Sequence, residues 1–506
     1  MKRRLAHSLL ALAALTAGCT VGPAYVRPSV PTSAAYKEQP PPSITPAAAT
    51  AAGIWNRARP ADRLPRARWW EVFGDPALNA LEAQVTAANQ TLKIAEANFR
   101  QARALIGRSS AAQFPTVSLA PEIDSLHWSD NRPYFSNTRT TGDFVLPFDL
   151  SYEADLWGRI AHSVSAAGEA AQASAADLAT ASLSLHAELM IDYFDLRAAD
   201  SQQKLLDSSV TAYEEALRLT ENRARGGAAP QSDVAQARTQ LDTTRVQATD
   251  IAVRRAQYEH AIAVLIGKPP AALNLPPAPL TLHPPAIPVG LPSDLLQRRP
   301  DIAAAERRVA AANERIGIAR AAYYPSLILN PSAGFEGTSL ANWFGWPSLF
   351  WAVGGSMTET LFDGGRRRAA SDAARAAYDA AVANYRQTTL GAFQEVEDNL
   401  AALRILDREA RQQDEAVAAA RDALRLFTNR YVGGRDTYLQ VIVAQTATLA
   451  NERNQTDILR RRLEASVLLV KALGGGWDVS DLPKIDDMKK ADSGDGSGSG
   501  RKISGR

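Results

Sequence analysis

Two long stretches of the chain, residues 159–222 and 366–430, contain no proline and one glycine each. The first stretch carries leucines at spacings of seven, four and seven residues: Leu178, Leu185, Leu189 and Leu196. This spacing is typical of a coiled-coil seam and predicts a single helix, about 96 Å long at 1.5 Å per residue. The second stretch predicts a helix of similar length, and helices this long need lateral partners.

Shorter helical segments are expected beside the first long helix. The segments 77–113 and 231–266 are each about half as long as that helix. Stacked end to end, they can run antiparallel beside it and form a coiled-coil pair roughly 100 Å long. Ile251, Tyr258 and Leu265 give the returning helix its own seam.

The chain contains an internal duplication, visible as residues that recur at a constant shift. At a shift of 210, the recurring pairs include Ala95 and Ala305, Ala102 and Ala312, Ile106 and Ile316, and Pro115 and Pro325. At a shift of 207, they include Gly158 and Gly365, Gly226 and Gly433, and Gly267 and Gly474. The sequence therefore predicts two structural repeats, each with the order helix, strand, strand, long helix, glycine turn and helix.

Four segments alternate apolar and polar positions and are predicted to be β-strands: about 115–128, 142–156, 325–337 and 349–362. The clearest places Phe144, Leu146 and Phe148 on one face and Asp143 and Asp149 on the other. Each segment is long enough for a tilted transmembrane strand, which needs ~9 to 11 residues. A strand of a soluble β-sandwich shows the same alternation, so this alternative stays open.

Aromatic residues gather at the second predicted hairpin: Trp343, Phe344, Trp346 and Trp351. A transmembrane barrel has such residues at its water–lipid interface, although aromatic packing within a loop is the alternative. Four strands cannot close a barrel, and open strand edges are not tolerated in lipid. The predicted fold class is therefore mainly α with a transmembrane β-barrel part, in which a trimer supplies a twelve-stranded barrel continuous with a long α-helical tunnel.

Composition and charge narrow the function classes. The 506 residues include 56 basic and 54 acidic side chains, a net charge of +2, so no charge excess attracts nucleic acid. Hydrophobic residues make up 46% and aromatic residues 7%, which favours long packed helices over one thick core. The six histidines are far apart, and no His-Glu-x-x-His or Gly-x-Ser-x-Gly motif occurs. The sequence thus points away from an enzyme and from a metal site.

The N-terminus has the parts of a bacterial signal peptide. Basic residues at 2–4 precede an apolar run at 9–17, and Cys19, the only cysteine, follows closely. A lone cysteine at this place suits acylation rather than a disulfide, and Thr20, where inner-membrane lipoproteins commonly carry Asp, implies export to the outer membrane. The alternative is a leftover cysteine after an ordinary signal, since Thr16 stands where lipoprotein signals usually have Leu. No later stretch has the roughly 20 consecutive apolar residues of a membrane-spanning helix.

These features divide the chain into six segments. They are a signal peptide (1–18), a lipidated N-terminal extension in the equatorial part (19–75), a first repeat (76–267), a Pro-rich linker (268–300), a second repeat (301–474), and a C-terminal extension (475–506) with a disordered tail.

Four segments also carry longer motifs: CTVGPAYVRP at 19–28, WWEVFGDPAL at 69–78, SYEADLWGR at 151–159 and LPSDLLQRRPDIAAAER at 291–307. In the last motif, Pro300 and Asp301 suit the first turn of a helix. Together the motifs resemble the outer membrane factor family, the TolC-like outer membrane efflux proteins, in the lipoprotein NodT-type branch of resistance-nodulation-division efflux systems. The resemblance covers nearly the whole mature chain.

The resemblance implies a homotrimer with its barrel in the outer membrane and its tunnel in the periplasm. The far tip would dock a periplasmic adaptor and an inner-membrane efflux transporter, and the duct would pass drugs, dyes, detergents or metal ions. No cofactor is expected apart from the covalent lipid, a palmitate, on Cys19. Two alternatives stay open: the exit channel of type I protein secretion, which shares the fold, and a periplasmic coiled-coil lipoprotein without a pore.

The turns at the far ends of the long helices are the predicted tips. By the family's Arg-x-x-x-Gly pattern, the adaptor-facing residues are Arg223, Gly226, Gly227, Arg430, Gly433 and Gly434. By position in the family, the residues of the periplasmic gate and tunnel mouth are Tyr431, Arg435, Asp436, Gln440 and Asp233. We expect Arg435 and Asp436 to hold the closed state. Gln440 and Val443 stand where relatives often carry Asp, so an acidic ring would depend on Asp436 or Asp233.

Overall fold

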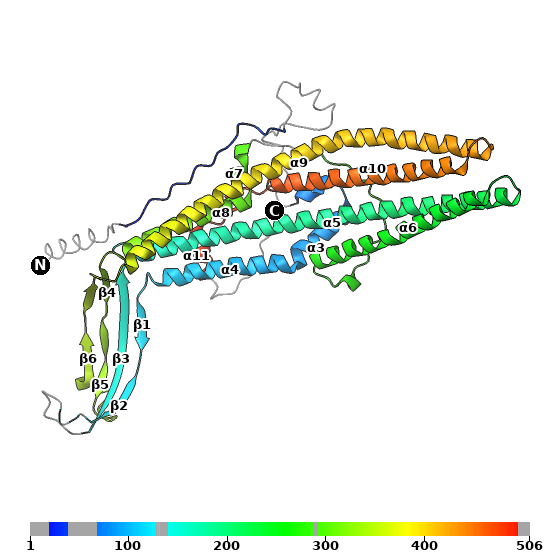
Figure 1. The fold of residues 1–506 in the computed structure, drawn as a ribbon. Coiled ribbons are helices and arrows are strands. Elements are labelled where there is room, and N and C mark those ends of the chain that lie inside the picture. The colour runs from blue at the N-terminus through cyan, green and yellow to red at the C-terminus, as the bar shows by residue number, and fades with distance from the viewer. Residues whose placement is uncertain are drawn as a thin grey trace.

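The structure, a computed structural model, describes residues 20–38, 68–127, 129, 131, 140–287 and 292–493. It is elongated, with a β-sheet at one end and a bundle of long helices that extends away from the sheet (Figure 1). The predicted signal peptide, Cys19, Trp128 and the C-terminal tail from residue 494 lie outside the described residues.

The elements follow the predicted order twice. The helices are α3 (Pro76–Ala88), α4 (Gln90–Ala111), α5 (Arg159–Arg225), α6 (Gln231–Leu265), α7 (Leu295–Arg298), α8 (Pro300–Ala321), α9 (Arg366–Val432), α10 (Tyr438–Ala472) and α11 (Ile485–Ser493). The strands are β1 (Thr116–Leu119), β2 (Glu122–Leu126), β3 (Thr141–Ala154), β4 (Ser326–Leu329), β5 (Ser332–Gly337), β6 (Leu349–Ala352) and β7 (Gly355–Thr358). Short 3-10 turns lie at Trp69–Phe73, Pro270–Ala272, Pro292–Asp294, Trp346–Ser348 and Val479–Asp481.

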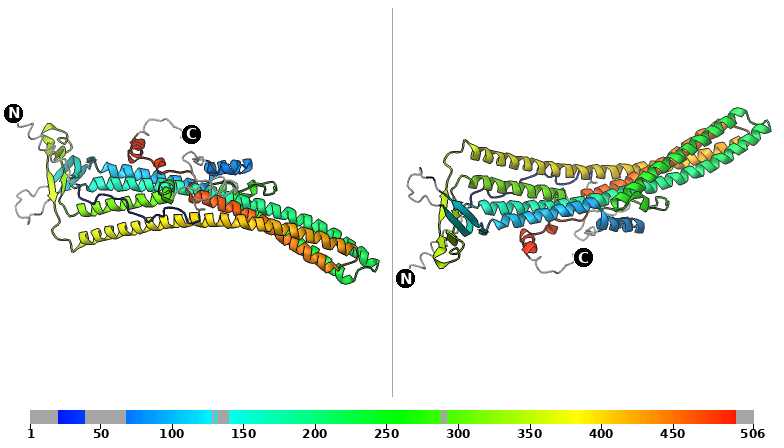
Figure 2. Two further views of the ribbon diagram at one scale, coloured as in Figure 1. Left: turned by 90° about the horizontal axis from the view of Figure 1, so that it is seen from above. Right: turned by 90° about the horizontal axis from the view of Figure 1, so that it is seen from below.

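The proline-free stretches form the two longest helices, α5 and α9, of 67 residues each. α6 and α10, of 35 residues each, return along the halves of these helices that lie far from the sheet. α4 and α8, of 22 residues each, run beside the halves near the sheet. Near the sheet the helices stand side by side in the order α4, α5, α8, α9 (Figure 2), so the two repeats share one curved layer.

Glycines allow the half-length helices to meet end to end. Gly267, with φ of 72°, ends α6 so close to α3 that a Cβ would lie 2.4 Å from the carbonyl oxygen of Ala88. Gly474, with φ of 92°, occupies the equivalent joint of the second repeat, where a Cβ would lie 1.9 Å from the carbonyl oxygen of Arg298. Only glycine accepts both the left-handed backbone and this close approach. The same helix–helix joint therefore occurs once in each repeat, with a glycine at the same position.

The predicted single helix at 77–113 is wrong, because the chain is broken at Asn89 into α3 and α4. Asn89 has an extended backbone, with ψ of 127°, and its side-chain oxygen accepts a hydrogen bond from the amide of Leu92 at 2.9 Å. Its side-chain nitrogen donates to the carbonyl oxygen of Leu265 at 2.7 Å. Asn89 thus caps the N-terminus of α4 and also donates a hydrogen bond to a carbonyl at the C-terminus of α6. Its side chain therefore connects the two helix ends at this joint.

The sheet is antiparallel and centred on β3. β1 and β2 pair along one edge of β3, β5 and β4 pair along the other edge, and β6 and β7 pair outside β5 and β4. Of the four predicted strands, only the one at 142–156 is continuous, and the other three are each broken into two. Pro121 and Pro331 account for two of the breaks, because proline has no N–H to donate to the ladder. The last predicted strand ends at Thr358 and does not reach Phe362.

Both flanking segments pack against the helices. Residues 20–38 run in an extended conformation along α8 and α9. The carboxylate of Glu397 in α9 accepts hydrogen bonds from the amides of Lys37, at 2.7 Å, and Glu38, at 3.0 Å. At the other end of the chain, Met488 of α11 is buried against α4 and α5.

A polar pair lies inside the main hydrophobic core, between α3 and α5. Oε2 of Glu82 lies 2.5 Å from Nδ1 of His186, and both side chains are almost completely buried. Trp70 stacks on the His186 ring at 4.3 Å, and the Thr86 hydroxyl lies 3.3 Å from Nε2. Burial raises the pKa of Glu82 to about 9 and lowers the pKa of His186 to about 4. At neutral pH the pair is therefore a neutral carboxylic acid that donates to a neutral imidazole.

We predict an unusual loss of stability as pH rises from about 4.5 to about 9. The stabilisation from Glu82 is complete below its unfolded pKa and is lost as pH rises toward about 9, because the folded state holds a proton that the unfolded state releases. The slope is roughly 1 kcal/mol per pH unit. His186 acts in the opposite sense, since its contribution is present above its unfolded pKa and is lost as pH falls through about 4. Glu82→Gln keeps a neutral donor and should flatten this fall of the thermal midpoint, measured by circular dichroism between about pH 4.5 and pH 9.

Glu96→Gln, which removes an exposed carboxylate from α4, is the matched control for this experiment. The fall of the thermal midpoint with rising pH should persist in that variant. Equal flattening in both variants would show that general surface charge, and not the buried pair, causes the pH dependence.

Candidate functional site

Two tight turns form the end of the bundle far from the sheet, where α5 turns into α6 and α9 turns into α10 (Figure 1). Each turn is closed by a backbone hydrogen bond across the helix end, of 2.8 Å in the first turn and 2.9 Å in the second. Gly227 and Gly434 take the left-handed conformation, with φ of 73° and 70°. Gly226 and Gly433 do not, with φ of −78° and −75°. The second glycine of each pair is thus the one that the turn requires.

The two turns are held together by Arg223. Its guanidinium lies 4.7 Å from the ring centroid of Tyr431, and one of its nitrogens donates to the carbonyl oxygen of Val432 at 2.9 Å. Tyr431 is only 3% exposed, its ring lies 5.1 Å from that of Tyr438, and its hydroxyl is 3.5 Å from the Thr220 hydroxyl. The structure therefore brings together a residue predicted to face the adaptor and a residue predicted for the gate.

The other predicted gate residues are not gathered in one place within a single copy. Asp436 accepts a hydrogen bond from Nε of Arg430 at 2.5 Å, which raises the pKa of the arginine. The side chain of Arg435 is exposed and forms no ion pair with the described residues. Gln440 is exposed as well, and Asp233 is half-buried in the first turn of α6. The pairing of Asp436 with Arg430 was visible in the sequence only as a six-residue spacing across a glycine turn.

At the opposite end of the molecule, one face of the sheet is apolar and open to its surroundings. Its exposed side chains, with exposed fractions from 39% to 73%, include Val117, Leu119, Ile123, Phe148, Leu329, Leu349, Trp351 and Met357. The register confirms that they share a face, since Leu119 is opposite Phe148 and Leu349 is opposite Phe335. Water is a poor solvent for a continuous surface of this kind, which marks a membrane or protein contact.

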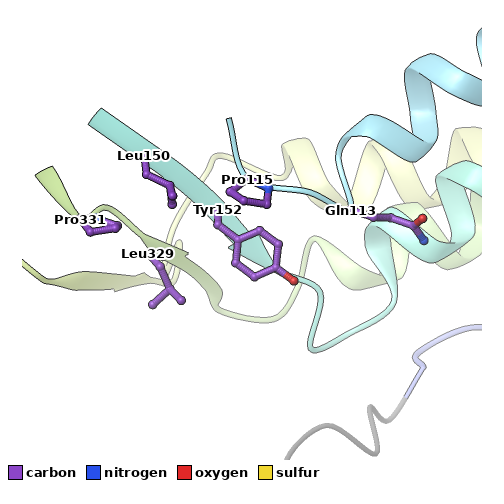
Figure 3. Close-up of a pocket in the computed structure, with 6 residues that line it drawn as sticks. All are labelled: Gln113, Pro115, Leu150, Tyr152, Leu329 and Pro331. Atoms are coloured by element: carbon purple, nitrogen blue, oxygen red, sulfur yellow. The ribbon is translucent and has the colours of Figure 1, made fainter. Parts of the chain in front are cut away.

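A shallow depression of about 310 Å³ lies on this face, near the helices (Figure 3). Its lining residues are Gln113, Pro115, Leu150, Tyr152, Leu329 and Pro331. It forms where two prolines flank β3 and the neighbouring strand is interrupted. The lining is almost wholly apolar, so the depression continues the apolar face.

The other face of the sheet is acidic. Asp124 lies opposite Asp143 in the register of β2 and β3, and Glu336 lies opposite Val145 on the far side of β3. Asp149 lies opposite Ser118, also on this face. The sheet therefore separates an apolar side from a charged side, as the alternation of the sequence predicts.

Aromatic side chains gather at both ends of the sheet. Trp343 is only 8% exposed, because it packs on Phe344 and its ring N–H donates to the carbonyl oxygen of Phe335, whereas Trp346 is 83% exposed. The predicted cluster is thus part loop packing and part exposed surface. A second group lies where the strands meet the helices: Phe114, Trp157, Tyr323, Tyr324 and Phe362. Two aromatic groups at opposite ends of an apolar surface are typical of membrane interfaces.

The described chain begins at the boundary between sheet and helices. The amide of Val21 donates to the carbonyl oxygen of Trp157 at 3.2 Å. A Cβ on Gly158, just before α5, would lie 3.0 Å from the methyl group of Thr20. Thr20 thus sits beside the start of the long helix, and Cys19 is the residue before it.

No helix among the described residues has the length and hydropathy that a bilayer crossing requires. The same residues include no group of three or more His, Cys, Asp or Glu side chains placed to hold a metal ion.

Comparison with known proteins relates these features to a family. The family described as outer membrane efflux protein matches residues 81–268 and 291–475. The solvent efflux pump outer membrane protein SrpC of Pseudomonas putida is 32% identical over 464 residues, which cover 92% of this chain and 96% of SrpC.

Two solved structures have the same architecture. The outer-membrane channel OprN, at 31% identity, has a TM-score of 0.82 and covers 91% of this chain and 100% of its own. The open state of the MtrE outer membrane channel of Neisseria gonorrhoeae, at 27% identity, has a TM-score of 0.78 and covers 91% of this chain and 99% of its own. The chain therefore belongs to the outer membrane efflux protein family, and it is an efflux channel of the outer membrane with a helical tunnel in the periplasm.

Proposed function

We propose that three copies of the chain close one twelve-stranded barrel. In a single copy, the outer edges of β1 and β2 and of β6 and β7 have no strand partner among the described residues. In lipid every backbone N–H and C=O must be paired within protein, so these edges require neighbouring copies. The observation that carries the proposal is the exposed apolar face of the sheet, which needs lipid around it.

The helices support the same assembly. α4 and α9 stand at the two ends of the curved layer, and α6 continues the line of α4. Large apolar side chains are exposed on these helices, including Ile94, Leu105, Val246 and Val253 on α4 and α6, and Leu390, Ile405 and Leu426 on α9. Neighbouring copies would cover them, and the layer would close into a tunnel below the barrel.

We infer that the trimer is the passive exit duct of a tripartite pump. It would receive drugs or other small toxic compounds from an inner-membrane transporter, through a periplasmic adaptor that contacts the two tips. The name of SrpC refers to solvent efflux, which favours this reading over type I protein secretion. The exposed apolar face disfavours a lipoprotein without a pore.

We also propose that Cys19 is acylated, as in the lipoprotein NodT-type branch. The position of Thr20 supports this proposal, because it lies beside Gly158, where the sheet meets the helices. In a protein whose sheet spans the membrane, this boundary is the periplasmic membrane surface. An acyl chain on the preceding residue would enter the bilayer directly.

We propose that the contact of Arg223 with Tyr431 helps to keep the tunnel mouth closed within each copy. It joins the α5–α6 hairpin to the α9–α10 hairpin. Arg435, which is exposed at the end of the molecule, and Asp436 are proposed to hold the closed state through contacts between copies. Gln440 and Asp233 are proposed to line the mouth.

We predict that an arginine on the apolar face of β1 prevents membrane insertion, whereas an arginine on the acidic face of the same strand does not. Leu119 and Phe148 lie opposite each other near the middle of the sheet, on the apolar face. Leu119→Arg would bring a charge into lipid, which costs ~2–4 kcal/mol near the bilayer midplane. The unmutated, detergent-extracted protein should be a trimer that inserts into planar bilayers and gives small single-channel currents, and Leu119→Arg should abolish insertion.

Ser118→Arg is the matched control, because the neighbouring residue points to the acidic face. This variant should still insert and conduct. If both arginine variants insert equally well, the apolar face is not in lipid. A monomer without conductance would overturn the channel.

We predict that Arg223→Ala opens the tunnel mouth. The substitution removes a cation–π contact and a hydrogen bond that together are worth about 1–2 kcal/mol, so the open population should rise roughly ten-fold. Single-channel recording measures this as larger or longer currents. Arg225→Ala is the control, since Arg225 lies in the same turn, is exposed, and among the described residues bonds only to the nearby Asn222. Equal currents from both variants would contradict a specific role for Arg223.

We predict that Asp436→Ala and Arg435→Ala also raise the conductance of the trimer, because each removes one side of a contact between copies. Arg430→Ala breaks only the pair within the turn and should have a smaller effect. The same recordings measure all three variants. If Asp436→Ala trimers conduct no more than the unmutated protein, Asp436 does not hold the closed state.

A further inference from the structure

The segment that joins β7 to α9 exposes two consecutive large apolar side chains. Leu361 and Phe362 are each 89% exposed, the highest values for any large hydrophobic side chain among the described residues. Such a pair is poorly accommodated by water and needs an apolar neighbour.

Three consecutive arginines follow in the first turn of α9. The N-terminus of a helix carries a partial positive charge, so arginines at this place are unfavourable. Arg367 is compensated, because its Nε donates to Asp363 at 2.8 Å and its guanidinium lies 5.4 Å from the ring centroid of Tyr323. Asp363 also accepts from two backbone amides of this turn, so the helix end itself is already satisfied.

Arg366 and Arg368 are less well compensated. The side chain of Arg368 is 86% exposed, and its ion pair with Asp372 is long, with Nε 4.0 Å from Oδ2. Arg366 is exposed and forms no ion pair within the part of the chain that the structure describes. Two guanidinium groups that the helix disfavours are therefore available to an anion from outside the chain.

The first repeat serves as an internal comparison, because Gly158 and Arg159 correspond to Gly365 and Arg366. There Arg159 forms two hydrogen bonds with Glu153, at 2.8 and 2.6 Å, and the next residue, Ile160, is buried. At the first junction, the arginine is therefore paired and the apolar side chain is buried within the same chain. The second junction, whose helix also begins after a left-handed glycine, leaves Leu361, Phe362, Arg366 and Arg368 without such partners among the described residues.

The second junction lies at the end of the sheet where Tyr323, Tyr324 and Trp157 gather. Tyr323 and Tyr324 are 42% and 41% exposed, as expected of residues at a water–lipid boundary. If the sheet spans the membrane, as proposed above, phospholipid headgroups of the periplasmic leaflet are at the height of the arginines. Acyl chains are then at the height of the apolar pair.

We propose that Leu361, Phe362, Arg366 and Arg368 bind anionic phospholipids of the periplasmic leaflet. This inference rests on the proposed membrane-spanning sheet. The guanidinium groups bind phosphate oxygens, with the geometry that suits arginine, and the apolar pair contacts acyl chains. The apolar pair directly before the arginines identifies the source of the phosphate as a lipid rather than a free ion. Three copies place three such sites around the barrel.

The test uses the full-length trimer in detergent, titrated with phosphatidylglycerol and phosphatidylethanolamine and examined by native mass spectrometry. Arg366→Gln with Arg368→Gln should lower the apparent affinity for phosphatidylglycerol by roughly 10- to 30-fold and leave phosphatidylethanolamine unaffected. Arg411→Gln with Arg425→Gln removes two exposed arginines farther along α9 and is the charge-matched control. Arg366→Lys with Arg368→Lys should restore part of the preference.

The outcomes separate the site from the channel itself. The glutamine pair should fold and form trimers at least as well as the unmutated protein, because it removes charges that the helix disfavours. Equal loss of phosphatidylglycerol in the α9 control, or no loss in either variant, overturns the inference while a conducting trimer leaves the proposed function intact. A protein that neither trimerises nor conducts overturns the proposed function first.

A second pair of substitutions tests the apolar half. Leu361→Ser with Phe362→Ser should weaken lipid retention and leave the trimer intact. If these substitutions instead dissociate the trimer and leave phosphatidylglycerol binding unchanged, the pair faces a second copy of the chain. That result would overturn the lipid contact.

Discussion

Every backbone donor and acceptor of a strand in lipid must be paired within protein, and the rest of the molecule depends on this constraint. A single copy pairs β3 on both sides but leaves two outer edges. In the proposed trimer, the neighbours that complete those edges also determine where the long helices stand, because α5 and α9 each begin a few residues after a strand. In that trimer the barrel would set the width of the tunnel below it, and the helices would need only to supply surfaces that fit their neighbours.

The duplication solves the problem of building a very long coiled coil from short loops. Each 67-residue helix crosses the middle of the molecule without a break, and two shorter helices meet beside it. The long helix runs past the point where the two shorter helices meet and holds them in line. The two helix ends therefore need only to pack closely against each other. Gly267 and Gly474 provide this contact, since any side chain would collide with the backbone of the helix it meets. The same requirement explains why these glycines recur at a constant shift.

Features that depend on neighbouring residues, such as helices and the faces of strands, could be predicted from the sequence. Features that depend on contacts between distant residues could not. The long helices follow from the absence of proline and the leucine spacing, and the two-faced sheet follows from the alternation around Phe144. The break at Asn89 was not predicted, because only its N-cap to Leu92 is local and its other hydrogen bond goes to Leu265, 176 residues away. Pro121 and Pro331 are local signals of the broken strands, and the alternation of apolar and polar positions does not reveal them. The contact of Arg223 with the second turn, 209 residues distant, leaves no local trace.

A link resists opening only if its two ends move apart. Arg430 and Asp436 lie six residues apart in one turn, so their pair can persist when the hairpins separate. Arg223 and Tyr431 belong to different hairpins, so their contact must break. In the proposed closure, the equivalent arginines of the two repeats would thus have different mechanical roles, although the turns around them have the same backbone. The proposed closure within a copy therefore depends on the contact of Arg223 with Tyr431, which has no equivalent, among the described residues, in the other pairing of the repeats. Duplication of the backbone alone would not have produced this contact.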